Sequence, residues 1–534
     1  MSSQGILRNT AVVAALTACS RVLGLVREML QSRLVGAGVE QSAFAVAFAM
    51  PNMARRMFGE GALTAAFVPV FRGELEADES LERARRLARA VMTMTMLMLA
   101  AGVLLAWCLI GGAFWAGGGT WLSGKWALTL EYVRLLIPYM LFICAAAFGM
   151  GVMNAFGRFA AAALMPSILN VVWIGALTAL MILTGGGTDA AFSVRRRLVW
   201  VCSAILVAGA LQMAFMLRAM AKKGITPLPT FRGWRDGSVR LVWRNMAIGC
   251  AGAGAVQINY MLDQLLALKA SDWAAGAIGY ADRLMELPLG IVGTAFGTVL
   301  LPTFSGFFAK GDEDGARSAF VSSTRNMLLL VLPAAVALVV LAPEITRLVY
   351  HGGKFDDVAV TRVARAVACY SAGLAFFCVQ KTLTPWFQAQ KDMKTPLKVA
   401  VRMVFLNAAL NVAAVFCLPE EWRHVGLAAS TVACAAISCA WLAGEARRRN
   451  GPLGWGRMAR PVALMLAACC VMAAALVALR ALMAGFAAGG APREVAAMAA
   501  YVACGAAAYF LVMGTFGRDV LADLAGDFRR RRAR

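Results

Sequence analysis

Charged residues are scarce in this chain. They make up 15% of its 534 residues, while hydrophobic residues make up 60%; a soluble globular domain carries roughly 25% charged residues. This composition argues against a water-soluble fold. Apolar runs of about 20 residues recur along the sequence, and each is long enough to cross a hydrocarbon core about 30 Å thick. The runs lack the alternation of outer-membrane strands, so they predict transmembrane helices.

Histidine and paired cysteine are also scarce. The only histidines, His351 and His424, are far apart in sequence and lie in predicted outer loops, so we expect no histidine-based catalytic centre. The 13 cysteines form no C-x-x-C pair, and they predict neither a metal site nor a disulfide framework. No signal peptide with a cleavage site is recognised before the first apolar run. We therefore expect no enzyme active site and no bound cofactor.

The apolar runs predict an all-α integral membrane protein with about fourteen transmembrane helices. No predicted connection is long enough to hold a separate soluble domain, and the longest lies near 222–239. Any binding chemistry is therefore expected within the helix bundle. The predicted helices cover residues 5–34, 39–72, 87–115, 128–155, 160–184, 198–221, 240–269, 273–309, 320–349, 360–389, 396–418, 424–446, 460–484 and 494–516.

The formal net charge of +23 is a value also found in nucleic-acid binders. Here, however, Lys and Arg collect in short segments between apolar runs, a distribution that argues against nucleic acid as a partner. With the N-terminus inside, 32 of the 52 Lys and Arg lie in inner segments and 14 in outer ones. The positive-inside rule then predicts that both termini are cytoplasmic. One outer segment, with Arg195, Arg196 and Arg197, opposes this rule.

A weak internal repeat occurs at a spacing of 233 residues. GALTAAFVPVF at 61–71 aligns with TAFGTVLLPTF at 294–304, which pairs Pro69 with Pro302 and Phe71 with Phe304. Duplicated halves are common in transporters, where the substrate site lies between the repeats. Chance similarity between apolar segments is the alternative. The repeat predicts two lobes related by pseudo-symmetry.

Several charged residues interrupt segments that are otherwise apolar. An Arg at the centre of a membrane helix costs roughly 2.5 to 3.5 kcal/mol on insertion scales, so such residues usually face a wet cavity or a partner. Gly24, Pro51 and Pro288 lie close to them, and broken helices at membrane depth usually line cavities. These charged residues are Arg21, Arg27, Glu28, Arg55, Arg56, Glu60, Asp263, Asp282, Arg283 and Glu286.

Two interpretations of these charges are open. One is ion pairing within the protein, of Arg27 with Glu28 or Glu60, and of Arg283 with Asp282 or Glu286. The other is an anion site, because the surplus is cationic and the planar guanidinium suits bidentate phosphate binding. The second interpretation predicts a central cationic cavity.

Four sequence motifs resemble those of the MurJ (MviN) lipid II flippases. The resemblance spans nearly the whole chain, and the longer motifs are too specific for accidental matching. This family belongs to the multidrug, oligosaccharidyl-lipid and polysaccharide exporter superfamily. The motifs are SRVLGLVRE at 20–28, AFAVAFAMPNMARRMFGEGALTAAFVPVF at 43–71, YADRLMELPLGIVGTAFGTVLLPTFS at 280–305 and KTP at 394–396.

The resemblance implies two six-helix lobes and two further helices that hold the undecaprenyl tail. The expected parts are an N-lobe at 1–222, a cytoplasmic linker at 223–239, a C-lobe at 240–449, the lipid-tail groove at 450–517 and a basic cytoplasmic tail at 518–534. The resemblance also implies a headgroup site. The residues that would bind the pyrophosphate headgroup of lipid II are Arg21, Arg27, Arg55 and Arg283. The expected location is the bacterial cytoplasmic membrane, with membrane lipids and cell-wall synthesis proteins as further partners.

One position departs from the family pattern. Relatives often carry an acidic residue in the stretch that reads GAGVEQSAF here, and this chain has Ser42 in its place, with Glu40 nearby. The usual gating salt bridge is therefore not assured. Some relatives resemble sodium-coupled carriers, so Asp263, Asn407 and Asn411 are candidate ligands for a monovalent cation. Coupling to the membrane potential is the alternative source of energy.

These observations predict a transporter that flips lipid II from the cytoplasmic to the periplasmic leaflet by alternating access. Glu28, Ser42, Arg56, Glu60, Asp282 and Glu286 are the candidates for gating contacts or ion pairs. The alternatives are an exporter of another polysaccharide-linked lipid or a drug, and a membrane scaffold for cell-wall synthesis. A cation-drug exporter would present carboxylates rather than surplus arginines.

Overall fold

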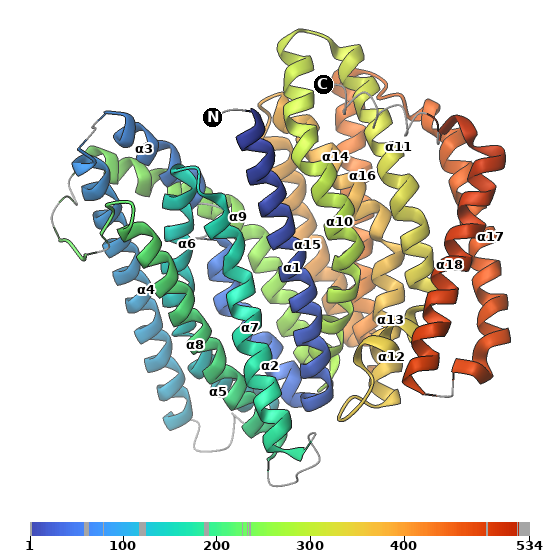
Figure 1. The fold of residues 1–534 in the computed structure, drawn as a ribbon, viewed down its shortest axis with the longest axis horizontal. Helices are drawn as coiled ribbons and strands as arrows, with labels where there is room; N and C mark the ends of the chain where they lie inside the picture. The colour runs from blue at the N-terminus through green and yellow to red at the C-terminus, as the bar shows by residue number, and fades with distance from the viewer. Residues whose placement is uncertain are drawn as a thin grey trace. The chain divides into compact units, whose positions relative to one another are not determined.

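The computed structural model describes residues 3–57, 63–77, 80–116, 124–185, 192–226, 228–231, 233, 236–487, 490–520 and 522. Long helices dominate these residues (Figure 1). The chain divides into two compact units. Unit 1 comprises Met1–Gly276 with Gly352–Asp356, and unit 2 comprises Ala277–His351 with Asp357–Arg534.

Unit 1 is built around α1, α2 and α5 to α8. Helix α1 packs along α7, α2 packs against α5, and α6 packs against α8. A core of aromatic and branched side chains joins these helices, with the Phe44 ring in edge contact with Tyr132 and with Trp173. The helices of this unit are α1 (Ser3–Val35), α2 (Val39–Ala54), α3 (Leu63–Ala77), α4 (Glu82–Ala116), α5 (Lys125–Leu136), α6 (Tyr139–Ala155), α7 (Phe159–Leu183), α8 (Val194–Ala221) and α9 (Gly237–Ala270).

Unit 2 contains the remaining helices. Helices α17 and α18 form a pair that packs on α11, and α11 also packs against α14, which joins α15 and α16. Figure 1 shows the α17–α18 pair in red, with its two helices side by side. The helices are α10 (Ala274–Ala309), whose first turn belongs to unit 1, α11 (Glu313–Val340), α12 (Ala342–Tyr350), α13 (Asp357–Ala372), α14 (Leu374–Ala389), α15 (Lys394–Cys417), α16 (Glu420–Asn450), α17 (Trp455–Ala487) and α18 (Ala491–Phe516).

The predicted helices correspond closely to the observed ones. Each of the fourteen predicted ranges overlaps either one helix or two consecutive helices. Among the described residues, eight helices are long and apolar enough to cross a membrane, or ten if each of two bent pairs counts as one span. The protein is therefore a multi-pass membrane protein, and the total of fourteen spans stays a prediction.

Proline and glycine explain the two bent pairs. Helices α5 and α6 meet at 45° with Pro138 between them, and α13 and α14 meet at 41° with Gly373 between them. Proline removes a backbone donor, and glycine allows close approach of a neighbour. At Gly373 a Cβ would lie 2.5 Å from Val432 Cγ2, so any larger residue there would require Val432 to shift.

Helix ends are fixed by local side chains. Asp392 accepts hydrogen bonds from the backbone N–H groups of Lys394 (2.9 Å) and Thr395 (3.0 Å), which opens α15 at the KTP motif. Burial raises the pKa of Asp392, but hydrogen bonds from Thr395, Arg449 and Lys394 outweigh this effect and lower the pKa to about 2.

The prediction that His424 lies in an outer loop was wrong. Helix α16 begins at Glu420, and the side chain of His424 is buried within it.

The segment between α8 and α9 packs on the start of α4. Arg85 Nε donates to Gly224 O at 2.8 Å, and Arg89 Nε donates to Thr226 O at 3.0 Å. Helix α9 then packs against α2, α3 and α4. The sequence places α9 in the second lobe, whereas this packing places it in unit 1. The predicted lobe boundary and the boundary between compact units therefore differ by one helix.

Candidate functional site

Arg27 is the most firmly held of the candidate arginines. The residue is only 8% exposed on α1, and its Nη1 donates to Asn170 Oδ1 of α7 at 3.0 Å. Its guanidinium lies 4.4 Å from the centroid of the Trp173 ring and pairs with Glu28. Asn170 in turn donates to Ser20 O at 2.9 Å. Ion pairing with Glu28 is thus confirmed, and the amide and the indole fix the orientation of the cation.

Arg55 and Arg56 follow Pro51 at the end of α2. Residues 55–57 form a π-helical turn, a feature that often occurs at functional sites. Arg55 Nε donates to Asn52 Oδ1 at 3.1 Å, and the Arg56 guanidinium lies 5.7 Å from the ring centroid of Tyr260 on α9. The widened turn therefore points two adjacent cations to different partners within unit 1.

Ser42 is completely buried on α2. Its hydroxyl accepts a hydrogen bond from the backbone N–H of Gly276 at 3.0 Å, in the first turn of α10. The first N–H groups of a helix have no partner within that helix. A Cβ at position 276 would lie 3.3 Å from Ser42 Oγ, so glycine permits this approach. In this chain, the residue at the atypical position is a helix cap.

Arg283 lies on α10 within unit 2. Its Nη1 is 3.1 Å from Glu286 Oε2, and both side chains are partly exposed. Asp282 precedes it on the same helix. The prediction of a pair with Glu286 is therefore confirmed. The pair is partly exposed, so the guanidinium is within reach of solvent.

Lys381 is a cation that the sequence analysis missed. It is exposed on α14, and it donates no hydrogen bond within the described part of the chain. A Cβ at Gly293 would lie 2.7 Å from Lys381 Cδ, so this glycine makes room for the lysine stem beside α10. The sequence feature by which Lys381 could have been recognised is its position within the apolar run of residues 374–389.

The cation-site candidates fall in both units. Asp263 lies on α9 in unit 1, where Asn259 Nδ2 donates to it at 3.3 Å. Asn407 and Asn411 are buried on α15 in unit 2, and Asn411 Nδ2 donates to Asn407 Oδ1 at 2.8 Å. Within the described ranges, no group of three His, Cys, Asp or Glu residues could hold a metal. The role of these residues in ion coupling stays a prediction.

The two remaining candidates differ in their surroundings. Arg21 is exposed on α1 and forms no hydrogen bond or ion pair with a residue that the structure describes. Glu60, the alternative partner of Arg27, lies outside the described residues. Asn170 and Trp173, which hold Arg27, were not among the predicted site residues, because they lie on a helix about 145 residues away.

The fold and these residues define a class of protein. Arginines on helices of a multi-pass membrane protein require compensation, and proteins that move charged solutes through a helix bundle supply it by a ligand or a wet pathway. Here Arg27 pairs with Glu28 and Arg283 with Glu286, and Arg21 forms no ion pair with a described residue. The protein thus belongs to the multi-pass helical membrane transporters.

Comparison with known proteins identifies the particular family. The family model described as lipid II flippase MurJ matches residues 31–495. A probable lipid II flippase MurJ from Rhizobium tropici is 32% identical over 483 residues, which cover 88% of this chain and 86% of that protein. The lipid II flippase MurJ of Burkholderia cenocepacia is 31% identical over 421 residues, covering 76% and 78%. The chain belongs to the MurJ lipid II flippase family.

A solved structure supports the same assignment at the level of the fold. The lipid II flippase MurJ in an inward closed conformation matches with a TM-score of 0.75 and 19% sequence identity. The match covers 96% of this chain and 100% of that chain. The helical architecture is therefore that of this family over nearly the full length.

Proposed function

We propose that this protein flips lipid II, the undecaprenyl-linked peptidoglycan precursor, from the cytoplasmic to the periplasmic leaflet. The family match over residues 31–495 carries the proposal. Flipping makes and breaks no bond, so the protein acts as a transporter and not as an enzyme. The proposed location is the bacterial cytoplasmic membrane, with both termini in the cytoplasm because basic residues concentrate in the inner segments.

The arginines on membrane helices give this proposal its chemical basis. The diphosphate of lipid II is anionic, and a guanidinium offers two parallel donors to a phosphate. Arg27 is held by Asn170 and Trp173, so little side-chain entropy remains to be lost on binding. Arg21 on the same helix is exposed, and Arg283 offers a partly exposed guanidinium in unit 2. We propose that these residues and Arg55 bind the headgroup.

Alternating access is the proposed mode of transport. The headgroup would bind from the cytoplasmic side while the lipid tail stays in contact with the bilayer at α17 and α18. A change of conformation would then expose the headgroup to the periplasm. Charged headgroups cross the hydrocarbon core at high cost, so protein cations must replace water around the diphosphate during transfer.

The arginine proposal can be tested with purified protein in liposomes. Arg27→Ala removes a charged donor from the headgroup, and a hydrogen bond to a charged group contributes about 1.5 to 3 kcal/mol. We therefore expect flipping of lipid II to fall by at least about tenfold. Arg27→Lys should restore only part of the rate, since an ammonium cannot bind bidentately. The measurement is the rate at which labelled lipid II becomes accessible in the opposite leaflet.

Arg402 offers a matched control. Its guanidinium lies 4.6 Å from the centroid of the Trp441 ring on a membrane helix, as Arg27 lies over Trp173, but it is exposed and outside the proposed site. Arg402→Ala should leave the flipping rate near that of the parent. Equal rates in the parent, Arg27→Ala, Arg55→Ala and Arg283→Ala would show that the headgroup is bound elsewhere. No flipping by the parent would reject the function itself.

A further inference from the structure

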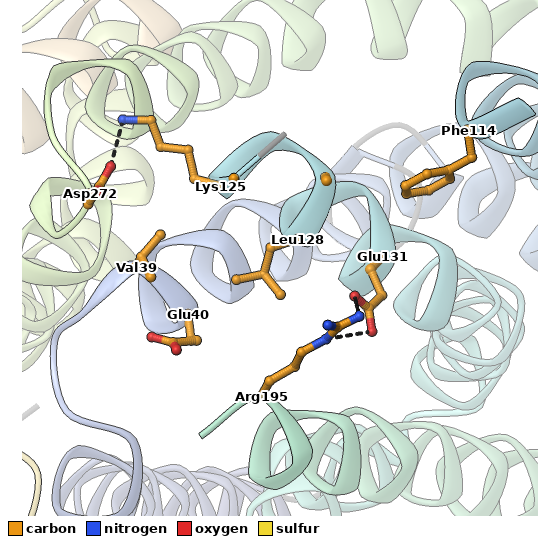
Figure 2. Close-up of a pocket in the computed structure, with 10 residues that line it drawn as sticks. Val39, Glu40, Phe114, Lys125, Leu128, Glu131, Arg195 and Asp272 are labelled. Atoms are coloured by element: carbon orange, nitrogen blue, oxygen red, sulfur yellow. Dashed lines mark hydrogen bonds and ion pairs between the residues drawn. The ribbon is translucent and has the colours of Figure 1, made fainter. Parts of the chain in front are cut away.

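A cavity of about 510 Å³ lies within unit 1, and its lining does not include Arg21, Arg27 or Arg55. It is formed where the first turns of α2, α5 and α8 meet the last turn of α4 and the connection between α9 and α10 (Figure 2). These segments are at the predicted outer end of their helices. The lining residues are Val39, Glu40, Phe114, Gly124, Lys125, Ala127, Leu128, Glu131, Arg195 and Asp272.

Four of the five charged residues in the cavity form ion pairs. Lys125 Nζ lies 3.0 Å from Asp272 Oδ1, and Arg195 forms a two-point contact with Glu131 that includes an Nε–Oε1 distance of 3.2 Å. Figure 2 shows both pairs, with Glu40 joined to neither. Glu40 forms no hydrogen bond or ion pair with any described residue. The cavity therefore carries one uncompensated negative charge.

The position of Glu40 at the start of a helix compensates only part of its negative charge. Glu40 lies in the first turn of α2, where a carboxylate interacts favourably with the helix dipole. That interaction is worth only a few tenths to about 1 kcal/mol at an exposed site, and it leaves the carboxylate oxygens free to accept hydrogen bonds. A cationic ligand would supply the missing partner.

The remaining walls of the cavity are apolar and include the exposed last turn of α4. Val39, Leu128 and Phe114 line the cavity. Phe114 is 39% exposed, and Trp115 beside it is 88% exposed, as expected of side chains in contact with the bilayer. An entering molecule would thus need an apolar part next to its cationic group.

We propose that this cavity binds a primary ammonium group carried on an amphipathic molecule. The ammonium would donate to Glu40, and the apolar part would lie along Leu128 and Phe114. A metal ion fits less well, because no described group of three acidic, His or Cys residues could hold one. Two sources of such an ammonium are an aminophospholipid headgroup and a long-chain amine without phosphate.

The cations of the cavity provide a means to separate the two sources. Lys125 has three N–H donors and Arg195 has five, so each retains donors beyond its ion pair. The partner of Lys125, Asp272, has a side chain that is 70% exposed. A phosphodiester could therefore accept hydrogen bonds from these residues while its ammonium binds Glu40. A simple amine would use Glu40 alone.

The test uses the full-length protein in phosphatidylglycerol nanodiscs doped with phosphatidylethanolamine, phosphatidylcholine or dodecylamine. Native mass spectrometry measures the additive that stays bound. We expect retention of phosphatidylethanolamine over phosphatidylcholine, whose quaternary ammonium has no N–H donor. Glu40→Gln should weaken that retention by about tenfold, the usual value of one charge-assisted hydrogen bond. Glu494→Gln, which removes a first-turn carboxylate from α18, should have no effect.

A second variant tests the proposal if the Glu40→Gln protein does not fold. Leu128→Trp keeps the carboxylate but fills the cavity, and it should abolish retention as well. Binding of phosphatidylethanolamine alone assigns the site to a lipid headgroup, and Glu40-dependent binding of dodecylamine assigns it to amines in general. Equal retention of each additive by the parent and the folded variants would overturn the proposal. Flipping of lipid II is not measured in this test, so its outcome is independent of the proposed function.

Discussion

Arg197 explains why one outer segment opposes the positive-inside rule. Its side chain is buried, with Nη1 donating to Leu34 O at 2.9 Å and Nε donating to Phe192 O at 3.0 Å. Leu34 lies in the last turn of α1, where carbonyl groups lack helical partners and a cation is favoured. Arg195 is paired with Glu131. Arg195 and Arg197 thus have structural partners, and a simple count of basic residues overstates the free charge.

We predict that Arg197→Ala destabilises the protein. The substitution removes two hydrogen bonds from a charged donor and leaves the Leu34 carbonyl buried, which should cost about 2 to 4 kcal/mol. The adjacent Arg196 is exposed, so Arg196→Ala should change stability by less than about 0.5 kcal/mol. Thermal unfolding of both variants in detergent measures the difference. Equal melting temperatures for the two would show that the contact of Arg197 with α1 contributes little.

At the scale of elements, the α17–α18 pair illustrates how membrane helices associate. Water gives no hydrophobic driving force inside the bilayer, so small residues that allow close packing matter most. A Cβ at Gly505 of α18 would lie 3.2 Å from Leu476 Cδ2 of α17. Tyr509 on α18 also donates to Leu329 O of α11 at 3.0 Å. Close contact at Gly505 and the hydrogen bond of Tyr509 together hold α18 within unit 2.

A bulky side chain at position 505 should therefore separate the pair. Gly505→Leu is expected to cost about 1 to 3 kcal/mol by overpacking against Leu476. Gly514 on the same helix has no atom within 4 Å of a built Cβ, so Gly514→Leu is a matched control and should be neutral. Chemical unfolding followed by tryptophan fluorescence compares them. If α17 and α18 hold the lipid tail, Gly505→Leu should also slow flipping, whereas comparable stability of both variants would contradict this account of the packing.

At the scale of the whole molecule, the orientation in the membrane follows from the distribution of basic residues. Reporter fusions after Arg232, Asp392 and Arg530 should report the cytoplasm, and a fusion after Gly353 should report the periplasm. Alkaline phosphatase and green fluorescent protein give opposite signals in the two compartments. An outer signal at Arg232 combined with an inner signal at Gly353 would reverse the predicted topology.

The sequence by itself determined the positions of the helices and the presence of cations among them. Membrane insertion depends on a local window of about 20 residues, so each apolar run predicts its helix without knowledge of its neighbours. The predicted helices 128–155 and 360–389 missed the breaks at Pro138 and Gly373, although a proline inside a helix is a local signal for such a break. The family resemblance rested on continuous motifs, and the family match over residues 31–495 confirmed it.

The tertiary structure alone decided which partners these residues have. Arg27 is bound by Asn170, 143 residues away, and Ser42 caps a helix that begins more than 200 residues later. The cavity around Glu40 is lined by five separate segments of unit 1. Contacts of this kind depend on how distant helices pack, and packing is set by the shapes of whole helix surfaces, which no local window of sequence contains.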